Sequence, residues 1–399
     1  MKRTLLIDLD NTLLRNEMDS FLPAYLKALS DFMSPLIEAD RLIQTLLAAT
    51  MKMTANNRPD KTLMDAFNET FFPALGRDPA ELTPHFEKFY AVEFPRLRAV
   101  TTPKPEAIAL VQQAQMHGYQ LGVATNPLFP RTAILQRLAW AGFSNEDSPF
   151  ALVPSYDTFH FAKPNPAYFA EFLAQMGWQE GPALMVGDDP ELDILPAQRF
   201  GLPVFWAPAH DNAAWRFSDE EPPRGSLQDV IAWFEAAPLR SMPVNVDQPE
   251  TTTAILSATP AALLTFSKQL PAEKWTVRPK PGEWSWLEII CHLRDVDAEV
   301  NLPRLKQVLA SHNPFLAGQD TDPWAEERQY IRQDGQEALG AMVANRLEIL
   351  SLLQNLDEAG WNRQARHAIF GPTTLKELVK IIADHDRLHI RQAHALLGM

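Results

Sequence analysis

The amino-acid sequence predicts an α/β domain with a parallel sheet, followed by an all-α domain. In the front half of the chain, short apolar runs that suit β-strands alternate with helical stretches, as the crossover units of a parallel sheet require. Helical patterns alone fill residues 17–98, between the first two of these runs. Beyond residue 250 there is no convincing strand, and four main helices in about 150 residues are typical of a four-helix bundle.

Length and charge narrow the class of protein. A chain of 399 residues is too long for one compact core, so we expect two or three domains. The net charge of −14 argues against a nucleic-acid or acidic-membrane partner, since both need a basic face. The start of the chain turns acidic before a signal-peptide core is complete, and no segment approaches the apolar length of a membrane span. We therefore expect a soluble, cytoplasmic protein.

Cys291 is the only cysteine in the chain. A single cysteine excludes an intrachain disulfide framework and a zinc site made only of thiolates. Any metal ion must therefore be held by carboxylate and imidazole groups.

Two aspartates follow the first predicted strand, Thr4 to Ile7, at its carboxyl end. Asp8 and Asp10 therefore lie where open α/β sheets bind their ligands. Period-two alternation points both side chains to the same side, so one carboxylate can attack a substrate while the other exchanges a proton with the leaving group. Because paired carboxylates repel, the pattern also implies a hard metal ion. Taken alone, the pair is equally well explained as two solvated aspartates.

The other predicted elements of the front half follow in order. After the helical insert come a helix at 104–117, a strand at 119–124 that leads into Thr125 and Asn126, a helix at 131–141, and strands at 150–154, 183–186 and 203–206. Lys163 is followed by Pro164 and Pro166. Because proline suits the first turn of a helix, we expect a helix to start just after Lys163. The proline-bearing, weakly patterned run 238–250 is interpreted as a linker.

Polar residues at these strand ends match the needs of phosphoryl transfer. A carboxylate nucleophile attacks phosphorus, an acid protonates the leaving oxygen, a hydroxyl and an ammonium hold the phosphoryl oxygens, and acidic groups hold magnesium. The candidate residues are, in chain order, Asp8, Asp10, Thr125, Asn126, Lys163, Asp188, Asp189 and Asp193. Taken singly, Thr125 is better explained as a strand-end cap and Lys163 as a surface lysine, but the ordered set is far more specific than its members.

Residues 1–235 resemble the haloacid dehalogenase-like (HAD) hydrolase superfamily. Its four motifs stand here as Asp8-Leu9-Asp10-Asn11-Thr12-Leu13, Ala124-Thr125-Asn126, Lys163-Pro164 and Gly187-Asp188-Asp189-Pro190-Glu191-Leu192-Asp193. The resemblance implies a Rossmann-like parallel sheet, over which residues 15–99 form an α-helical cap that closes on the substrate. We therefore predict a hydrolase domain at 1–237, with its core at 1–14 and 100–237.

The resemblance also implies a role for each acid. Asp8 would be the nucleophile that forms an aspartyl-phosphate, and Asp10 the general acid/base. Asp188 would bind Mg²⁺ together with Asp8 and the backbone carbonyl of Asp10. Asp193 matches the last acid of the motif and would act close to the ion, while Asp189 occupies a more variable position.

The expected activity is that of a Mg²⁺-dependent phosphatase acting on a small phosphate monoester. Dehalogenases of the superfamily need neither magnesium nor a proton for the departing halide, so an acid at Asp10 argues against that chemistry. A phosphomutase stays open as an alternative. Pro127 directly after the second motif, and Pro196 where a glycine is common, depart from the family pattern in loop geometry rather than in chemistry.

The four main helices of the back half have clear start signals. Thr259 and Pro260 open a helix that runs to about residue 270. Capping boxes beginning at Ser285 and Thr374 open two others. Residues 335–356 are strongly helical and carry an apolar face.

Three histidines of these helices are predicted to face the interior. His292 falls within the apolar stripe of the helix opened by Ser285, and His385 and His389 share the stripe of the last helix. Two imidazoles four residues apart lie on one helical face, and a third from a facing helix completes a three-histidine metal site with open positions. Hydrogen-bonded core histidines are the alternative. His394 breaks the spacing and is not predicted as a ligand.

Residues 251–399 resemble the DinB-like metal-binding bundle family. The resemblance lies in residues 279–285, in His292-Leu293-Arg294-Asp295, in residues 370–375, and in residues 383–392 with His385 and His389. It implies a divalent ion, often zinc or nickel, on His292, His385 and His389. Some relatives are transferases or isomerases whose metal activates a low-molecular-weight thiol. The bundle is therefore a second enzyme, or else a passive sensor or dimerisation module that forms a homodimer.

Overall fold

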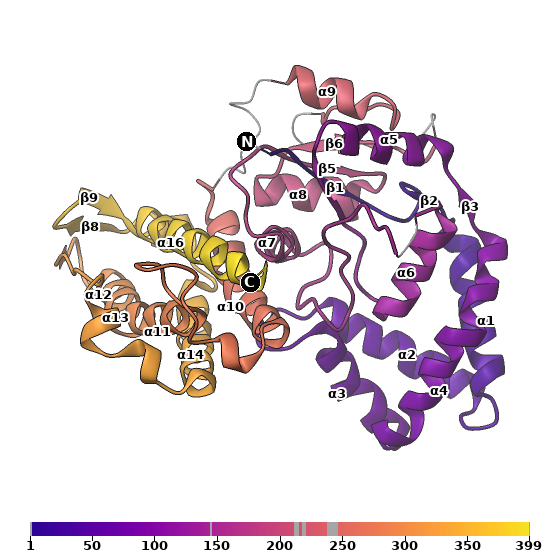
Figure 1. The fold of residues 1–399 in the computed structure, drawn as a ribbon, viewed down its shortest axis with the longest axis horizontal. Coiled ribbons are helices and arrows are strands. Elements are labelled where there is room, and N and C mark those ends of the chain that lie inside the picture. Colours follow the sequence, from indigo (N-terminus) through magenta and orange to yellow (C-terminus); the bar gives the residue numbers. More distant parts are fainter. Residues whose placement is uncertain (1, 144–145, 211–214, 218–220, 238–245, 399) are drawn as a thin grey trace. The chain divides into compact units, whose positions relative to one another are not determined.

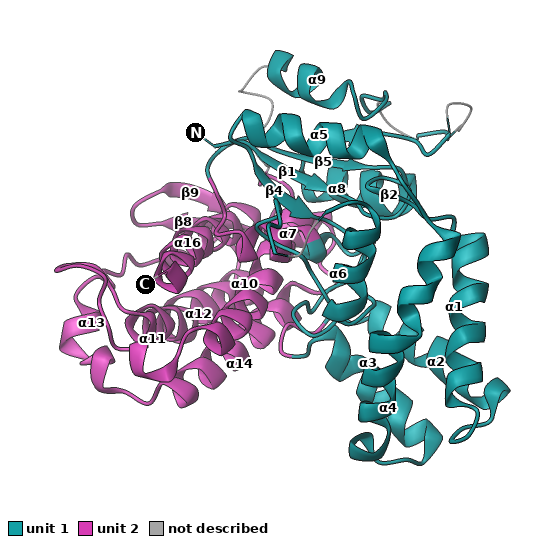
Figure 2. Cartoon of the chain, turned by 45° about the vertical axis from the view of Figure 1, so that its right-hand side comes forward, with its two compact units in different colours: residues 1–57, 61–168, 180–244 teal, residues 58–60, 169–179, 245–399 magenta. Residues whose placement is uncertain are grey.

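The structure is a computed structural model that describes residues 2–143, 146–210, 215–217, 221–237 and 246–398 (Figure 1). Most of the predicted linker, 238–250, lies outside the described residues. The chain forms two compact units, shown in different colours in Figure 2. Unit 1 comprises residues 1–57, 61–168 and 180–244, and unit 2 comprises residues 58–60, 169–179 and 245–399.

Unit 1 is built on a four-stranded parallel sheet with the strand order β4-β1-β5-β6. These strands are β1 (Thr4–Ile7), β4 (Gln120–Val123), β5 (Ala183–Gly187) and β6 (Val204–Trp206). Ile7 is in register with Val123 and Val186, so the carboxyl ends of the three strands lie level. All residues of β1 and β5 are buried, as expected for a parallel sheet with helices on its faces. The predicted α/β architecture is confirmed.

Helices connect the strands of this sheet or, in the case of the last one, follow β6. They are α5 (Pro105–Met116), α6 (Arg131–Trp140), α7 (Pro166–Gln175), α8 (Leu195–Phe200) and α9 (Val230–Ala236). The strand predicted at 150–154 is reduced to one bridge between Leu152 and Gly122. Pro154 has no N–H to donate, which is a physical reason why the ladder does not extend.

The insert after β1 is all-helical, as predicted, and contains α1 (Met18–Met33), α2 (Ala39–Thr54), α3 (Leu63–Leu75) and α4 (Pro79–Val92). A 3₁₀ turn, Phe94–Val100, completes it. Two short strands that the sequence did not indicate, β2 (Leu14–Arg15) and β3 (Thr102–Pro103), pair antiparallel at the two ends of the insert. This pairing brings the entry and exit of the insert side by side.

Unit 2 contains the four predicted main helices, but the predicted start of the first one, at Thr259 and Pro260, is wrong. This helix begins ten residues earlier, at Pro249, which takes the first-turn proline position, and Pro260 lies inside it. The four helices are α10 (Pro249–Gln269), α11 (Trp286–Val296), α14 (Gly335–Leu353) and α16 (Leu375–Ala395). Both predicted capping boxes are formed, at Ser285 with Glu288 and at Thr374 with Glu377. A π-helical turn (Asp297–Asn301) leads from α11 to α12 (Leu302–Ala310), and α13 (Trp324–Glu327) and α15 (Glu358–Trp361) are single turns. Among the described residues, no helix is both long enough and apolar enough to cross a membrane.

The expectation of no strand beyond residue 250 is wrong. A three-stranded sheet joins β7 (Phe315–Leu316), β8 (Gln364–His367) and β9 (Gly371–Thr374). Strands of two to four residues are too short to show a clear period-two pattern, which is why the sequence did not reveal them.

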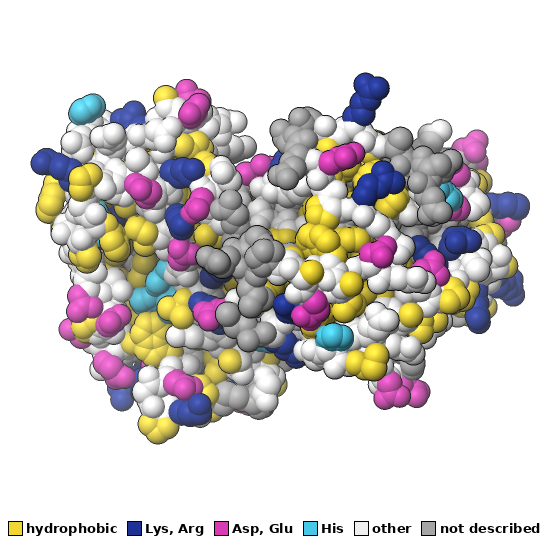
Figure 3. Space-filling view, turned by 90° about the horizontal axis from the view of Figure 1, so that it is seen from above, with side chains coloured by type: hydrophobic (Ala, Val, Ile, Leu, Met, Phe, Trp, Pro, Cys, Tyr) yellow, Lys and Arg dark blue, Asp and Glu magenta, His cyan; other side chains and the backbone are white. Residues whose placement is uncertain are grey.

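Charged side chains of both signs are spread over the surface. Figure 3 shows Lys and Arg interspersed with Asp and Glu on the face in view. The chain has 36 basic and 50 acidic residues, so the excess is acidic. A local excess of basic side chains is therefore a departure from the average of the molecule.

Candidate active site and metal centre

Asp8 is held at the carboxyl edge of the sheet by the backbone. Its N–H donates to the Val186 carbonyl of β5 at 2.9 Å, which continues the ladder one residue past β1. The side chain is only 6% exposed. The Lys163 ammonium donates to Asp8 Oδ1 at 2.9 Å. Lys163 thus engages one carboxylate oxygen of Asp8 and not the other.

Lys163 is buried between two carboxylates. Its Nζ also donates to Asp193 Oδ1 at 2.5 Å. Burial lowers the pKa of Lys163, but Asp193 and Asp8 more than offset this and raise the pKa above its ordinary value. Asn126 fixes the Lys163 backbone, because its Oδ1 accepts the Lys163 N–H at 3.1 Å. Asn126 thus positions the lysine.

Thr125 follows β4 with its hydroxyl in the interior. The residue is 1% exposed, and Thr125 Oγ1 has no hydrogen-bond partner among the described residues. Its backbone carbonyl accepts the Tyr168 hydroxyl at 2.8 Å, which anchors the loop. A buried hydroxyl without a partner costs free energy, and this one is available to donate a hydrogen bond to an oxygen of a bound ligand.

Three carboxylates converge next to Lys163. One oxygen each of Asp8, Asp188 and Asp193 lie within 4.8 Å of one another. Burial and the neighbouring acids raise the pKa of Asp188 to about 8 and that of Asp193 to about 7. Oxygen ligands of this kind suit a hard cation, which would relieve the mutual repulsion. The residues present therefore fit Mg²⁺.

Asp189 lies differently from the other acids of its motif. Its Oδ1 accepts the backbone N–H groups of Glu191 at 2.7 Å and Leu192 at 3.0 Å, which caps the π-helical turn Pro190–Ile194. Its carboxylate is outside the group of three. Pro196 lies in the first turn of α8, where proline is tolerated, so it does not disturb the loop.

Asp10 is held by two donors, and the sequence analysis missed both of them. Asn16 Nδ2 donates to Asp10 Oδ1 at 2.6 Å, and the Arg137 guanidinium donates to the same oxygen. The Asp10 carboxylate lies outside the group of three. Burial lowers the pKa of Arg137 to about 10, although the charge of Asp8 opposes this. The sequence contained a signal for the burial of Arg137, because its position falls on the same face of α6 as the buried Ala133.

Three histidines converge in unit 2. His385 Nε2 lies 3.0 Å from both His292 Nε2 and His389 Nε2. Burial lowers the pKa of all three imidazoles, that of His292 to about 3, so they are neutral near pH 7 and able to bind a metal. His389 Nδ1 pairs with Gln392 Oε1 at 2.8 Å, which favours Nε2 as the ligand atom. The plane of Trp284 stacks parallel to His389.

The acids nearest to these histidines in sequence are bound elsewhere. Asp386 accepts both terminal nitrogens of the buried Arg346, and Arg346 also pairs with Asp297 at 2.9 Å. Asp295 accepts the Tyr330 hydroxyl at 2.8 Å and the Arg328 guanidinium at 2.7 Å. The Arg346 ion pairs join α14 to α16 and to the π-helical turn after α11, and with Asp295 engaged as well the three imidazoles remain as the candidate ligands.

Comparison with known proteins shows the family of the front half of the chain. Residues 2–201 match the family model described as haloacid dehalogenase-like hydrolase. The chain belongs to the haloacid dehalogenase-like hydrolase family. It is therefore a hydrolase of the HAD type. Residues 255–393 match the model of the DinB superfamily.

Several known proteins are similar to parts of this HAD hydrolase. A phosphoglycolate phosphatase of Rhodospirillum rubrum is 30% identical over 209 residues, which is 51% of this chain and 78% of that protein. A phosphoglycolate phosphatase of Mesorhizobium japonicum is 33% identical over 103 residues, which is 26% of this chain and 42% of that protein. The solved four-helix bundle YfiT from Bacillus subtilis is 19% identical, with a TM-score of 0.35, and the match covers 38% of this chain and 87% of that one.

A cavity of about 760 Å³ opens in the helical insert of the HAD unit. Its walls come mainly from apolar and aromatic side chains of α1–α4 and from the loop after β4. Phe129 lines this cavity, and its ring also lies 5.5 Å from the Arg137 guanidinium. The charged lining residues are Glu87, Arg131 and Asp157, so the cavity has no excess of positive charge.

Proposed function

We propose that unit 1 is a Mg²⁺-dependent phosphatase that hydrolyses a small phosphate monoester through an aspartyl-phosphate on Asp8. The observation that carries this proposal is the meeting of the Asp8 carboxylate, the Lys163 ammonium and the unpartnered Thr125 hydroxyl at one edge of the sheet. The relatives named phosphoglycolate phosphatase support it.

Each of these residues has its own role in the proposed reaction. The free oxygen of Asp8 attacks phosphorus, a P–O bond to Asp8 forms, and the ester P–O bond breaks. Asp10 gives a proton to the leaving alcohol oxygen and later takes one from the water that hydrolyses the aspartyl-phosphate. Lys163 and Thr125 hold phosphoryl oxygens, while Asn126 keeps Lys163 in place.

Magnesium fits the acidic side of this site. In the proposal Asp8 and Asp188 would hold the ion together with the backbone carbonyl of Asp10, and Asp193 would lie close to it. When bound, the ion would neutralise charge on the carboxylates and on the phosphoryl oxygens. Asp189 is left out as a ligand, because its carboxylate already accepts two backbone N–H groups.

The test compares two aspartate substitutions in the full chain. Asp8→Asn should reduce turnover of an aryl phosphate with Mg²⁺ by at least about a thousandfold, because the amide is a poor nucleophile. Asp189→Asn is the matched control, since its side-chain oxygen can still accept the two N–H groups. A chelator should abolish wild-type turnover. If Asp8→Asn hydrolyses the ester as fast as Asp189→Asn, the nucleophile assignment is wrong.

The dehalogenase alternative finds less support than the phosphatase. A departing halide needs no proton, whereas the structure holds Asp10 with two donors next to the nucleophile loop. A phosphomutase would use the same residues and differs only in the acceptor of the phosphoryl group. Release of inorganic phosphate into solution distinguishes the two activities.

For unit 2 we propose a divalent transition-metal site, zinc or nickel, on His292, His385 and His389. Three Nε2 atoms about one hydrogen bond apart, on the buried His292 and His389 and the half-buried His385, are costly without a shared cation, and imidazole ligands favour these metals over magnesium. Three protein ligands leave coordination positions open, which would admit a low-molecular-weight thiol. A passive sensor is the alternative use of the same site.

Metal analysis of the full chain tests this site. The wild type should carry about one zinc or nickel per chain, and His385→Ala or His389→Ala should lose most of it. His394→Ala is the matched control, because His394 packs against the Phe266 ring instead. Stoichiometric metal that survives both substitutions would rule out the three-histidine site.

A further inference from the structure

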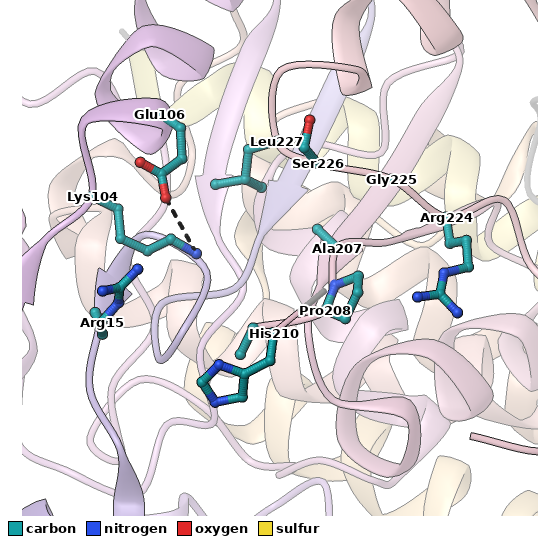
Figure 4. Close-up of a pocket in the computed structure, with 11 residues that line it drawn as sticks. Arg15, Lys104, Glu106, Ala207, Pro208, His210, Arg224, Gly225, Ser226 and Leu227 are labelled. Atoms are coloured by element: carbon teal, nitrogen blue, oxygen red, sulfur yellow. Dashed lines mark ion pairs between the residues drawn. The ribbon is translucent and has the colours of Figure 1, made fainter. Parts of the chain in front are cut away.

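A second cavity of unit 1, of about 640 Å³, adjoins the proposed catalytic residues (Figure 4). Ala207, the first residue after β6, lines it and donates its N–H to the Gly187 carbonyl at 2.9 Å. Lys104 also lines it, and its Nζ donates to the Asn11 carbonyl at 2.7 Å. Gly187 precedes Asp188 and Asn11 follows Asp10, so this cavity lies at the same edge of the sheet as the candidate active site.

The lining of this cavity is cationic, unlike the molecule as a whole. Arg15, Lys104 and Arg224 contribute positive charges, and Glu106 is the one acidic lining residue among those described. His210 adds an imidazole. The whole chain, in contrast, has 50 acidic against 36 basic residues. Such a local reversal of charge favours the binding of anions.

Lys104 is the buried member of the set. It is 7% exposed, and its nearest carboxylate, Glu106, lies 3.9 Å away, at the limit of an ion pair. Figure 4 shows Arg15 beside the Lys104 side chain. Burial lowers the pKa of Lys104 and the charge of Arg15 acts in the same direction, while the charges of Glu106, Asp188 and Glu17 oppose this. A buried cation near a like charge is costly unless an anion is shared between them. Lys104 has donor capacity left for that anion, because it makes one hydrogen bond to Asn11.

The two cavities of the unit differ in the ligands that they suit. The cavity in the helical insert is largely apolar and has more acidic than basic lining residues. The cavity around Lys104 has three basic side chains and room for a small molecule. A carboxylate or phosphate group therefore matches the second cavity and not the first.

We propose that the cavity around Arg15, Lys104 and Arg224 binds an oxyanion, either a carboxylate or a phosphate. The anion is the second charged group of the substrate ester or the inorganic phosphate released from it. This inference rests on the proposed phosphatase function of unit 1, and it narrows the substrate or product recognised there.

The first arm of the test measures binding without turnover. The full chain is titrated calorimetrically with inorganic phosphate in the wild type, Arg15→Gln and Lys104→Met. Each cavity variant should bind phosphate at least about tenfold more weakly, since a charge-assisted hydrogen bond is lost. Lys88→Gln, which removes one exposed positive charge from α4, is the control and should bind as the wild type does. Arg15 is exposed, so Arg15→Gln keeps the test valid if Lys104→Met fails to fold.

The second arm identifies the source of the anion. The ratio of kcat/KM for 2-phosphoglycolate to that for ethyl phosphate is compared between the wild type and Arg15→Gln. A roughly tenfold fall in this ratio assigns the anion to the substrate, because only one of the two esters carries a carboxylate. A constant ratio with weaker phosphate binding assigns it to released phosphate. Both results support the site.

Two results would overturn the inference. One is unchanged phosphate affinity together with an unchanged kcat/KM ratio in folded Arg15→Gln. The other is a loss of phosphate affinity in Lys88→Gln as large as that in Arg15→Gln, which would show that any loss of positive charge weakens binding. If the wild type hydrolyses no phosphate ester, the proposed function fails and the binding arm alone decides whether the oxyanion site exists.

Discussion

Arg137 links the proposed acid/base to the packing of unit 1. Its guanidinium donates to Asp10 and lies 5.4 Å from the ring centroid of Phe21 and 5.5 Å from that of Phe129. Arg137 Nε has no acceptor among the described residues, so the contact with Asp10 is the main polar interaction of this buried cation. We infer that Arg137 orients Asp10 and does not touch the reacting atoms.

Replacing Arg137 by glutamine should lower kcat by about tenfold to a hundredfold, because a misplaced acid/base loses part of its contribution. The loss should be largest for alkyl phosphates and smallest for p-nitrophenyl phosphate, whose leaving group needs little protonation. Arg137→Lys keeps the charge and should recover part of the rate. Steady-state kinetics with both substrates check this, and an equal loss on both would leave Arg137 a purely structural role.

At the scale of elements, the end of β5 is shaped around Asp193. A Cβ atom on Gly187 would lie 2.2 Å from Asp193 Oδ2, so a side chain at this position would displace the carboxylate. The Asp189 N–H donates to the same oxygen at 3.1 Å, and Lys163 holds the other one. The strand end and the π-helical turn after it therefore fix one acid of the proposed metal site.

Gly187→Ala should weaken Mg²⁺ activation by about tenfold or more and destabilise the fold by about 1–3 kcal/mol, as overpacking usually does. Gly340→Ala serves as the control, because nothing lies within 4 Å of its Cβ position in α14 and alanine favours a helix. Activity as a function of Mg²⁺ concentration and thermal unfolding measure the two effects. An unchanged Mg²⁺ dependence in Gly187→Ala would contradict the role assigned to Asp193.

The sequence predicted the strand ends better than the contacts between side chains. Asp8, Asp188 and Asp193 were expected together because parallel strands end at one edge of the sheet. Asp189 belongs to the same motif, but whether a carboxylate caps a turn or faces an ion depends on backbone geometry that spacing does not encode. Arg137 was missed because helical periodicity reports burial and not the partner of a buried charge.

At the scale of the whole molecule, the two units respond to pH in opposite directions when metal is absent. The raised pKa values of Asp188 and Asp193 mean that the folded state keeps protons that the unfolded chain has released, so stability falls as the pH rises toward 8. The lowered pKa values of the three histidines mean that the unfolded chain takes up protons first, so stability falls as the pH drops below about 6.5.

Calorimetric unfolding of the chelated full chain should therefore show a lower unfolding temperature of unit 1 at pH 8 than at pH 6.5, and a lower unfolding temperature of unit 2 at pH 5 than at pH 6.5. Each proton held by only one state changes stability by about 1.4 kcal/mol per pH unit. Adding Mg²⁺ should remove the loss at pH 8, and Asp188→Asn should flatten that side of the profile. A profile that rises steadily from pH 6.5 to pH 8 would contradict the assigned shifts.

The central claim is that Asp8 carries the phosphoryl group during turnover. The most direct measurement is rapid quenching of the full chain with Mg²⁺ and an aryl phosphate, reductive trapping of the acyl phosphate with borohydride, and mass spectrometry of the peptides. The trapped modification should be found on Asp8 in the wild type and in Asp189→Asn, and be absent without Mg²⁺. Phosphate release without any modification of Asp8, or a modification on another residue, would contradict the account.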